Sequence, residues 1–509
     1  MTPDTDLDPE SESESESEPK SKQLHSSLCA QRNALLSNIT YNFFLLHTLL
    51  FLSLTDDITY TTPNEPLLLQ QLLTANAANN WSLNPHCAPY PRAEDLHIEQ
   101  QYYQHTLGGN VNYYLYAAYY DRRLAIINTP SITILAMMSS MAGPFASAYC
   151  QVWYEADAEP NIVPMQQQTV MWYKEWSTEA GQLYPVLLSC QLPNNPRSSR
   201  VPELVSLVFD DRCARPTNAL RVVYEAPQRK RVRRFAVCVK DLNFPHVEMS
   251  QRWIEWLEML RLLGAERVTA YDLGGESLLP QTRRTLQHYV TQDGLLRLRP
   301  HRLLHKMPTP TLNRLGKSLN EVLCYVDCFY RHIYEFDYVG IFDVDEVIMP
   351  LGELHNWTVL LQQLERDSNQ VLEDPPYEEN CEARASYCFR NIYFPNDWPV
   401  DERVSSAFHM LQHVQRVAEH SDHNSYVKCL HSTHFVQSVH NHFPFSWQGS
   451  CGPYHVPVEL GQLQHYRKFE NRTMDRISDR TSVRDDNIWR FKDKLILNVL
   501  AKQRELDRS

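Results

Sequence analysis

The chain has 509 residues, a formal net charge of −13 and 43% hydrophobic residues, so it is long enough for two or three folded domains. Eight acids and no base lie in residues 1–18, and the remainder of the chain therefore carries a net charge of only −5. The one short basic run, residues 229–234, is interpreted as an exposed linker. The composition excludes a typical nucleic-acid-binding protein, and no nucleic-acid partner is predicted.

The N-terminal region contains a polar tail followed by an apolar segment. Residues 1–31 are of low complexity, with alternating Ser and Glu, and are predicted to be a disordered acidic tail in the cytosol. Residues 33–55 contain no Asp, Glu, Lys or Arg, and the stretch 35–54 is about as long as a bilayer span. Basic residues precede it, so the positive-inside rule favours a transmembrane signal-anchor. A buried amphipathic helix of a soluble protein is the alternative.

Residues 56–95 are interpreted as a stem, because Pro, Asn and polar residues are scattered through them. One short helical pattern occurs there, at residues 67–73. Asn80, Asn356 and Asn471 lie in sequons beyond the apolar segment and could carry glycans, as expected of a glycoprotein.

Residues 96–228 are predicted to form a smaller β-rich module. Short β-prone runs alternate there with turn residues, which is typical of a sandwich or another sheet-rich module. The runs lie at residues 113–119, 132–138, 149–154, 170–176, 184–188, 204–209 and 220–224. Aromatic residues of this module could bind sugar, although core packing is their expected use.

Residues 229–509 are predicted to form an α/β domain. Strand patterns alternate with helical patterns, and the first helix closes on Gly264, a helix C-cap signal. This alternation predicts a doubly wound, mostly parallel sheet. The strands are expected at residues 235–239, 267–271, 295–298 and 338–342, and the helices at 249–263, 282–290 and 319–334. No G-x-G-x-x-G or Walker motif occurs, which argues against a dinucleotide site or a P-loop.

The twelve cysteines are dispersed, and they fit either free core thiols or several disulfides. Cys324 and Cys328 are four residues apart in a helical pattern, but no C-x₂-C pair or matching His spacing accompanies them. Zinc is therefore not expected.

The sequence Asp343-Val344-Asp345-Glu346 follows directly after the fourth predicted strand. Asp343 and Asp345 are two residues apart, so in an extended chain their carboxylates point to the same side. The carboxyl ends of parallel strands are where open α/β sheets bind ligands. Two hard oxygen donors there suit Mg²⁺ or Mn²⁺ and, through the metal, a diphosphate. A solvated acidic turn is the alternative interpretation.

Several segments together resemble glycosyltransferase family 92. They are FAVCVKDLNF (235–244), WIEWLEMLRLLGAERVTAYD (253–272), YVDCFYRH (325–332), IFDVDEVIMP (341–350) and QLQHYR (462–467), with YYLYAAYYDRR (113–123) resembling the family's N-terminal region. The resemblance covers roughly residues 110–500, in the family's order. One position departs from the family's pattern, because Val326 precedes Asp327-Cys328 where an Asn is expected.

The resemblance implies a GT-A-type domain in a type II, single-pass Golgi membrane protein with its catalytic part in the lumen. It also implies a UDP-sugar donor, with UDP-galactose expected, and inversion at the transferred sugar. The acceptor would be a glycan on a glycoprotein, a glycolipid or a polysaccharide, and Mn²⁺ (or Mg²⁺) would be the cofactor. Other interpretations are a catalytically inactive, membrane-anchored lectin and a different metal-dependent enzyme such as a phosphohydrolase.

The predicted site residues fall into three groups, and one histidine pair competes with the first of them. The expected metal ligands are Asp343, Asp345 and His465, and the last of these belongs to the family's late His-Tyr-Arg. The expected donor and phosphate contacts are Asp343, Lys240, Tyr271, Lys428 and Arg467. An inverting transferase needs a carboxylate as general base, and the sequence leaves Asp401, Glu402 and Glu459 as candidates among several acids that follow the D-V-D motif. His440 and His442 are a competing pair of possible metal ligands.

Overall fold

The computed structural model describes residues 65–78, 87–123, 129–155, 157, 159–176, 178–179, 181–194, 200–225, 234–304, 314–367, 383–423, 425–468 and 481–508. The residues in these ranges all belong to one compact unit. Within the ranges just given, no helix is both long and apolar enough to cross a membrane. The predicted tail, 1–31, and the predicted signal-anchor, 33–55, lie outside these ranges.

The first described element is a helix that packs against the β-rich module. Helix α2 (Glu65–Ala78) contains the helical pattern predicted at 67–73. Its Leu73 is buried in a small cluster with Tyr90 and Trp153. Its Glu65 forms ion pairs with Arg221 and Arg331. This part of the predicted stem is therefore fixed to the folded unit.

In the described ranges the β-rich module contains ten strands, and its alternating runs predicted a sheet-rich module of this kind. They are β1 (Ile98–Gln100), β2 (Tyr103–Gly108), β3 (Val111–Asp121), β4 (Ser131–Met138), β5 (Ala148–Trp153), β6 (Asn161–Pro164), β7 (Gln167–Val170), β8 (Tyr184–Gln191), β9 (Leu204–Phe209) and β10 (Leu220–Val223). Their pairing joins them into one sheet in the order β6-β5-β9-β10-β3-β4-β8-β7, with β2 on β3 and β1 on β2. The disulfide Cys150–Cys190 links β5 to β8, which are distant in this order, so the sheet folds back on itself as a sandwich would.

One predicted strand of the module, at residues 170–176, is wrong. Strand β7 ends at Val170, and residues Lys174–Trp176 form a short 3₁₀ helix, η2. The aromatic residues of this segment stack on rings from another part of the chain instead of joining the sheet. Tertiary contacts thus override the strand preference of aromatic residues.

The four predicted α/β strands lie side by side and are all parallel. They are β11 (Phe235–Leu242), β12 (Ala265–Asp272), β13 (Leu296–Pro300) and β14 (Tyr338–Ile341), in the order β13-β12-β11-β14. The helices between them are α3 (Ser250–Leu263), α4 (Pro280–His288), which continues into the π-helical η5 (Tyr289–Asp293), and α5 (Arg314–His332). Gly264 ends α3 in the left-handed conformation, with φ of 109°, as its C-cap signal predicted.

The sheet is mixed, because three further strands extend it beyond β14. Strands β19 (Lys428–Ser432), β16 (Arg384–Phe389) and β22 (Cys451–His455) follow in that order, and β19 is antiparallel to β14. A second, three-stranded sheet contains β15 (Glu346–Pro350), β23 (Gly461–Arg467) and β17 (Asn391–Pro395). The other elements are β18 (Gln415–Val417), β20 (Val436–Val439), β21 (Pro444–Trp447), β24 (Ser482–Arg484), α6 (Trp357–Asp367), α7 (His409–Gln412), α8 (Lys492–Arg508) and the 3₁₀ turns η1 (Ala93–Asp95), η4 (Gly275–Ser277) and η6 (Asn487–Phe491).

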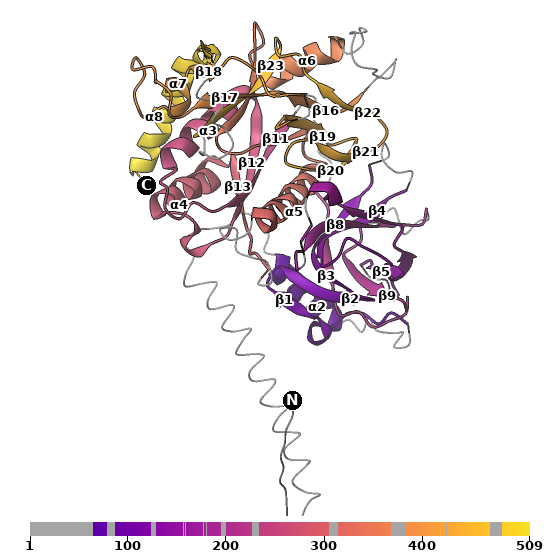
Figure 1. The fold of residues 1–509 in the computed structure, drawn as a ribbon. Coiled ribbons are helices and arrows are strands. Elements are labelled where there is room, and N and C mark those ends of the chain that lie inside the picture. The colour runs from indigo at the N-terminus through magenta and orange to yellow at the C-terminus, as the bar shows by residue number, and fades with distance from the viewer. Residues whose placement is uncertain are drawn as a thin grey trace, which may run out of the picture. The chain divides into compact units, whose positions relative to one another are not determined.

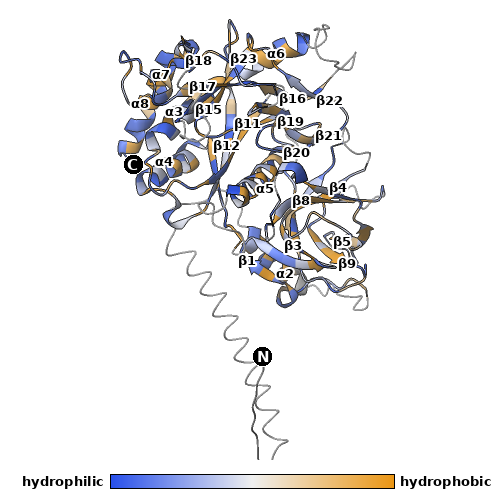
Figure 2. Cartoon of the chain, in the orientation of Figure 1, coloured by the Kyte–Doolittle hydropathy of each residue, from blue (hydrophilic) through white to orange (hydrophobic). Residues whose placement is uncertain are grey.

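Successive side chains of β11 point to opposite faces of the sheet, and each face packs into a different hydrophobic core. Phe235, Val237 and Val239 pack with α3, while Ala236 and Cys238 pack with α5 and the module. Helix α5 lies between the main sheet and the β-rich module (Figure 1) and is buried along nearly its whole length from residue 319 onward. Figure 2 shows hydrophobic residues along the strands of both parts, whereas α8 is mainly hydrophilic.

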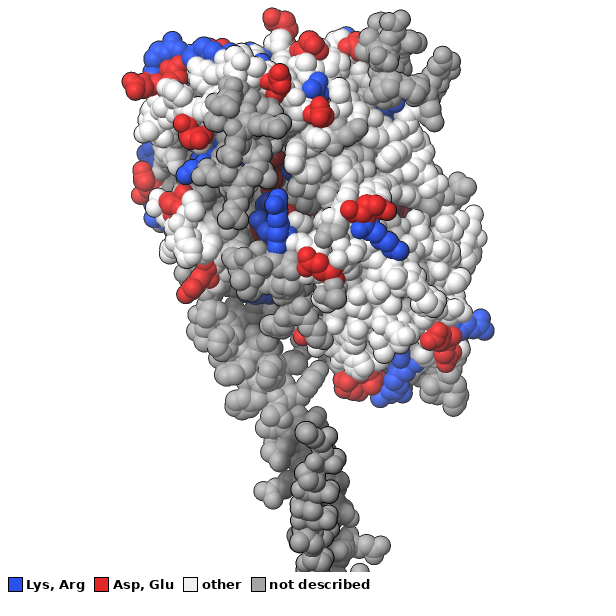
Figure 3. Space-filling model, in the orientation of Figure 1, with Lys and Arg blue, Asp and Glu red and all other residues white. Residues whose placement is uncertain are grey.

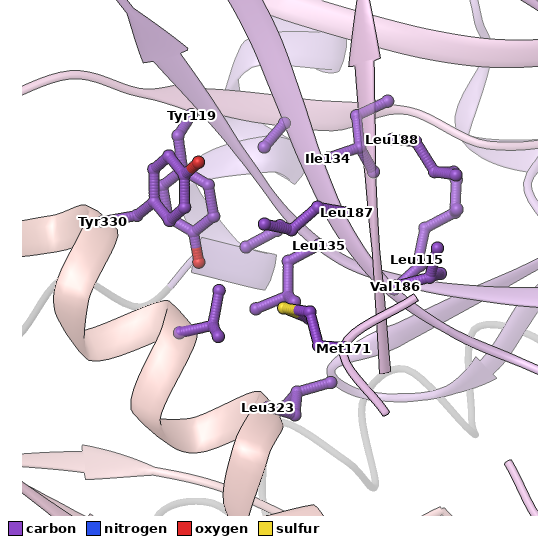
Figure 4. Packing of buried hydrophobic residues seen from close by; sticks show 14 of the residues in the cluster. Leu115, Tyr119, Ile134, Leu135, Met171, Val186, Leu187, Leu188, Leu323 and Tyr330 are labelled. Carbon is purple, nitrogen blue, oxygen red and sulfur yellow. The ribbon is translucent and has the colours of Figure 1, made fainter. Parts of the chain in front are cut away.

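The junction between α5 and the module is apolar and closely packed. Leu323 and Tyr330 of α5 face Leu135, Leu187 and Met171 of the module (Figure 4). Tyr330 also stacks on Tyr119 of β3, with 4.9 Å between ring centroids. The β-rich module and the α/β part therefore share one hydrophobic core. This core packs against the parallel sheet, whose strand β14 leads into the D-V-D motif.

Candidate functional site

The D-V-D motif forms the turn between strand β14 and strand β15. Strand β15 pairs with β23 in antiparallel register, and this register places Glu346 directly opposite His465. The backbone N–H of Tyr466 donates to the carbonyl oxygen of Asp345 over 2.8 Å. Backbone pairing thus brings the late His-Tyr-Arg segment to the motif, although more than one hundred residues separate the two in sequence.

Asp343 is held by two lysines from neighbouring strands. Its Oδ1 lies 2.9 Å from Nζ of Lys240, at the end of β11, and its Oδ2 lies 3.5 Å from Nζ of Lys428, at the start of β19. Burial alone would raise the pKa of Asp343, but Lys240 and Lys428 together hold it well below its usual range. Asp343 is therefore a carboxylate whose orientation is fixed by ion pairs. Its backbone N–H donates to Oε2 of Glu346 over 2.9 Å.

Lys428 is fully buried, and its ammonium group contacts oxygen atoms of three side chains. Its Nζ lies 3.0 Å from Oε2 of Glu346 and donates to Oδ1 of Asn441 over 2.5 Å, in addition to its pairing with Asp343. Burial opposes the charge, but Glu346 and Asp343 raise the pKa of the ammonium above its usual value. Lys240 is similarly shared, with Glu321 of α5 3.2 Å away.

Asp345 and His465 form the more open side of this cluster. Oδ2 of Asp345 lies 3.6 Å from Nε2 of His465, and the Asp345 side chain is 35% exposed. Nδ1 of His465 lies 3.6 Å from Oε1 of Glu346. Burial would lower the pKa of His465, but the nearby carboxylates, Asp345 first, raise it. The imidazole ring lies against Tyr393, with 5.3 Å between ring centroids.

The cluster interleaves carboxylates with basic groups. Glu321, Asp343 and Glu346 each pair with a lysine, and Lys317 lies 3.8 Å from Glu321 in addition to Lys240. Among the described residues Asp345 forms an ion pair only with His465, which leaves its carboxylate the most available to a cation. In the described part of the chain, no three His, Cys, Asp or Glu side chains are already arranged to hold a metal ion. Mg²⁺-type cations are commonly held by one or two carboxylates, with substrate phosphates and water completing the shell. Asp345 could supply a carboxylate to a site of that kind, and His465, 3.6 Å away, could supply a nitrogen once it had lost its proton.

The family profile of glycosyltransferase family 92 matches residues 233–499. This chain belongs to glycosyltransferase family 92. No match was found among the curated proteins. The family 92 match contains every residue of the charged cluster and confirms the resemblance predicted from the sequence. As a family 92 member the chain is a glycosyltransferase, which uses a sugar donor and a glycan acceptor.

Two of the predicted donor contacts of this family 92 chain form no side-chain hydrogen bond or ion pair with the charged cluster. Tyr271 is completely buried, and its hydroxyl donates to Asp327 over 2.5 Å. Arg467 is exposed at the end of β23. Their contact with a donor stays a prediction, whereas Lys240 and Lys428 lie directly at the motif.

The three candidate bases stay predictions as well. Asp401 pairs with Arg403 and Arg484, 2.7 and 2.9 Å away. Glu402 lies in the exposed segment between β17 and α7, and Glu459 lies in the turn before β23. None of these contacts distinguishes one candidate from the others.

The alternation of His440 and His442 suggested that they lie on one strand, but the structure shows that they do not. His440 and His442 belong to the turn between β20 and β21, and their ring centroids are 6.4 Å apart. Nδ1 of His442 lies 3.2 Å from the carbonyl oxygen of Val427. Sequence reasoning did not identify Glu321 or Asn441, because each is an ordinary polar residue of a helix or a turn and only the fold brings it to a lysine.

Proposed function

We propose that this family 92 glycosyltransferase moves a hexose, with galactose the expected one, from a UDP-sugar to a glycan acceptor. The proposal includes a GT-A-type arrangement of the sheet, inversion at the transferred sugar and assistance by Mn²⁺ or Mg²⁺. The observation that carries it is the charged cluster at the carboxyl ends of β11 and β14. Open α/β sheets bind their ligands at this edge.

Asp345 and His465 are the residues that would hold the divalent cation. When bound, such a cation neutralises charge that develops on a diphosphate leaving group. Asp343, fixed by Lys240 and Lys428, would orient the donor, and Glu346 positions His465 through Nδ1. Inversion needs a carboxylate that accepts the proton of the acceptor hydroxyl, and Asp401, Glu402 and Glu459 are the candidates for that role.

The proposed location is the Golgi membrane, with a single-pass type II anchor at residues 33–55 and the catalytic part in the lumen. Four disulfides in the described ranges support an oxidising compartment. They are Cys87–Cys213, Cys150–Cys190, Cys238–Cys328 and Cys388–Cys429. Disulfides form and persist along the secretory route and are rare in the cytosol.

The decisive test is the variant Asp345→Ala in purified full-length protein. We expect the wild type to consume a UDP-sugar in the presence of Mn²⁺ and a panel of glycans, and the variant to lose at least about 100-fold of this rate. The carboxylate is partly exposed, so the thermal unfolding temperature should change little. Glu353→Ala, an exposed acid just after β15, is the matched control and should keep full activity.

Two results would contradict the proposal. Undiminished activity of Asp345→Ala would remove the metal assignment. A wild-type protein that binds glycans stably but neither hydrolyses nor transfers any UDP-sugar would favour the lectin alternative.

A further inference from the structure

Four aromatic side chains form a partly exposed surface where the β-rich module meets the β20–β21 hairpin. We call this surface the aromatic platform, and it consists of Tyr173, Trp176, Phe443 and Phe445. Tyr173 is 43% exposed and Trp176 is 38% exposed, while Phe443 and Phe445 are half-buried. Exposed aromatic groups that lie together, as opposed to singly, mark interaction surfaces.

The rings of the platform hold one another in fixed orientations. Tyr173 stacks on Phe445 with 4.6 Å between ring centroids, and Trp176 stands perpendicular to Tyr173, also at 4.6 Å. Trp176 meets Phe443 edge-on at 5.9 Å. Two rings come from the segment after β7 and two from the hairpin, so the platform exists only because the two parts pack together. A preorganised set of rings loses little conformational entropy when it binds a ligand.

A buried imidazole without partners lies next to the platform. Both ring nitrogens of His440 are buried, and neither has a hydrogen-bond partner among the described residues. Its ring lies 4.8 Å from Trp176 and stacks on Phe443 at 5.3 Å. Burial lowers the pKa of His440 to about 4, so the ring is neutral near pH 7 and offers one donor and one acceptor. Unsatisfied buried polar groups are uncommon and costly, but a ligand hydroxyl would reach these nitrogens only if the rings that cover them shifted.

The platform is connected to the charged cluster through a single turn of the chain. Asn441, between His440 and His442, accepts the hydrogen bond from Lys428, and Lys428 pairs with Asp343. Phe443 follows two residues later and belongs to the platform. A molecule on the platform is therefore beside the edge where the donor sugar is proposed to bind.

We propose that the aromatic platform binds the glycan acceptor, by stacking a neutral pyranose on Trp176 and Tyr173. This inference rests on the proposed transferase function of the same site. A pyranose has an apolar C–H face, which matches the exposed rings of Trp176 and Tyr173. The surface on the side of β4, β21 and β22 is largely uncharged (Figure 3). Lys174 and Glu175, which lie between Tyr173 and Trp176, are exposed but of opposite sign, so this segment offers no net charge to a ligand.

The test compares Trp176→Ala and Tyr173→Ala with the control Phe145→Ala in the full chain. Phe145 is equally exposed, at 39%, but is not part of the platform. Two quantities are measured: binding to an array of neutral oligosaccharides, and binding of UDP with Mn²⁺ by calorimetry. We expect each platform variant to bind oligosaccharides about tenfold more weakly, the change that about 1.4 kcal/mol of lost contact produces. UDP binding should not change, Phe145→Ala should match the wild type, and Trp176→Phe should recover most of the loss.

The outcomes separate this inference from the proposed function. If the wild type transfers sugar and the platform variants keep the wild-type acceptor KM and array binding, the platform proposal is wrong and the transferase stands. If the wild type binds no UDP, and Trp176→Ala binds the oligosaccharide array more weakly than the wild type, then the platform does bind glycans but the transferase proposal fails. If the variants instead lose binding to a protein whose glycans have been removed enzymatically, the surface recognises polypeptide and the proposal is overturned.

Discussion

At the scale of single residues, Lys428 is the side chain on which the order of the charged cluster depends most. It is fully buried and lies within ion-pair distance of both Asp343 and Glu346. In Lys428→Met, the buried Glu346 and the mostly buried Asp343 lose a shared counter-charge, and breaking a buried pair by removing one partner is strongly destabilising. We expect the free energy of unfolding to fall by about 3 kcal/mol or more, measured by guanidinium denaturation at pH 7.

The control for this prediction is Lys468→Met, because Lys468 is exposed next to the end of β23. Surface substitutions away from special features usually change stability by no more than about 0.5 kcal/mol. A loss of donor binding in Lys428→Met without any loss of stability would instead identify Lys428 as a direct phosphate contact, as the sequence predicted.

At the scale of elements, Glu255 joins helix α3 to the short helix α7. Its carboxylate accepts hydrogen bonds from the backbone N–H groups of Met410 and Leu411, at 3.1 to 3.3 Å. Burial raises the pKa of Glu255 to about 7, and these hydrogen bonds only partly oppose the rise. The folded protein therefore holds a proton on Glu255 at pH values where the unfolded chain, with a usual value of 4.5, has lost it.

The sign of the resulting pH dependence follows from this difference. Stability decreases with pH wherever the folded state binds more protons, so Glu255 destabilises the fold progressively from about pH 4.5 to about pH 7. Glu255→Gln keeps an oxygen that accepts from Met410 and Leu411 and removes the titration. We expect the variant to be within about 1 kcal/mol of the wild type at pH 5 and to be more stable at pH 8, by on the order of 3 kcal/mol.

Thermal unfolding at both pH values checks this prediction. The matched control is Glu276→Gln, because Glu276 is exposed and in η4. An unchanged stability difference between Glu255→Gln and the wild type at pH 5 and pH 8 would show that Glu255 is ionised throughout and that its backbone hydrogen bonds outweigh burial.

Sequence patterns predicted the helices and strands that are specified by their own residues and by their immediate neighbours in the chain. The four parallel strands and their helices were predicted because each strand is a short apolar run and α3 ends on Gly264. Strands β19, β16 and β22 were not predicted, because their neighbours in the sheet are distant in sequence and no periodicity specifies which strands pair. The same distinction holds in the site. Asp343 and Asp345 are adjacent in sequence and could be recognised, whereas the pairing of Glu346 with His465 depends on the register of β15 and β23.

At the scale of the whole molecule, one buried carboxylate connects the β-rich module to the α/β part. Asp327 of α5 accepts hydrogen bonds from the hydroxyls of Tyr119, on β3, and Tyr271, on β12. Its oxygens also lie 3.0 Å from Nε of Arg331 and 3.5 Å from Nε of Arg299. Arg331 in turn pairs with Glu65 of α2. A single network thus spans both parts and the first described helix.

The variant Asp327→Asn tests whether the two parts unfold as one. It leaves the buried guanidinium groups of Arg299 and Arg331 without their shared counter-charge, so we expect a loss of about 3 to 5 kcal/mol. Because the network joins both parts, denaturant should still produce one transition, shifted equally for signals from the module and from the α/β part. Tyr119→Phe, which removes one hydrogen bond and no charge, should cost only about 1 kcal/mol.

The pH dependence of Asp327→Asn distinguishes the loss of ion pairs from a disturbance of packing, because only the ion pairs depend on the ionisation of Asp327. Burial would raise the pKa of Asp327, but Arg331 and Arg299 lower it to about 2, against a usual value of 3.8. A lowered carboxyl pKa gives stability that is complete above about pH 4 and is lost as the pH falls toward 2. The wild type should therefore lose its advantage over Asp327→Asn across this range, as measured by acid unfolding of both proteins. A constant difference between them down to pH 2 would mean that the asparagine disturbs packing and that the ion pairs contribute nothing. Two separate transitions, of which only one shifts, would mean that the module folds independently of the α/β part.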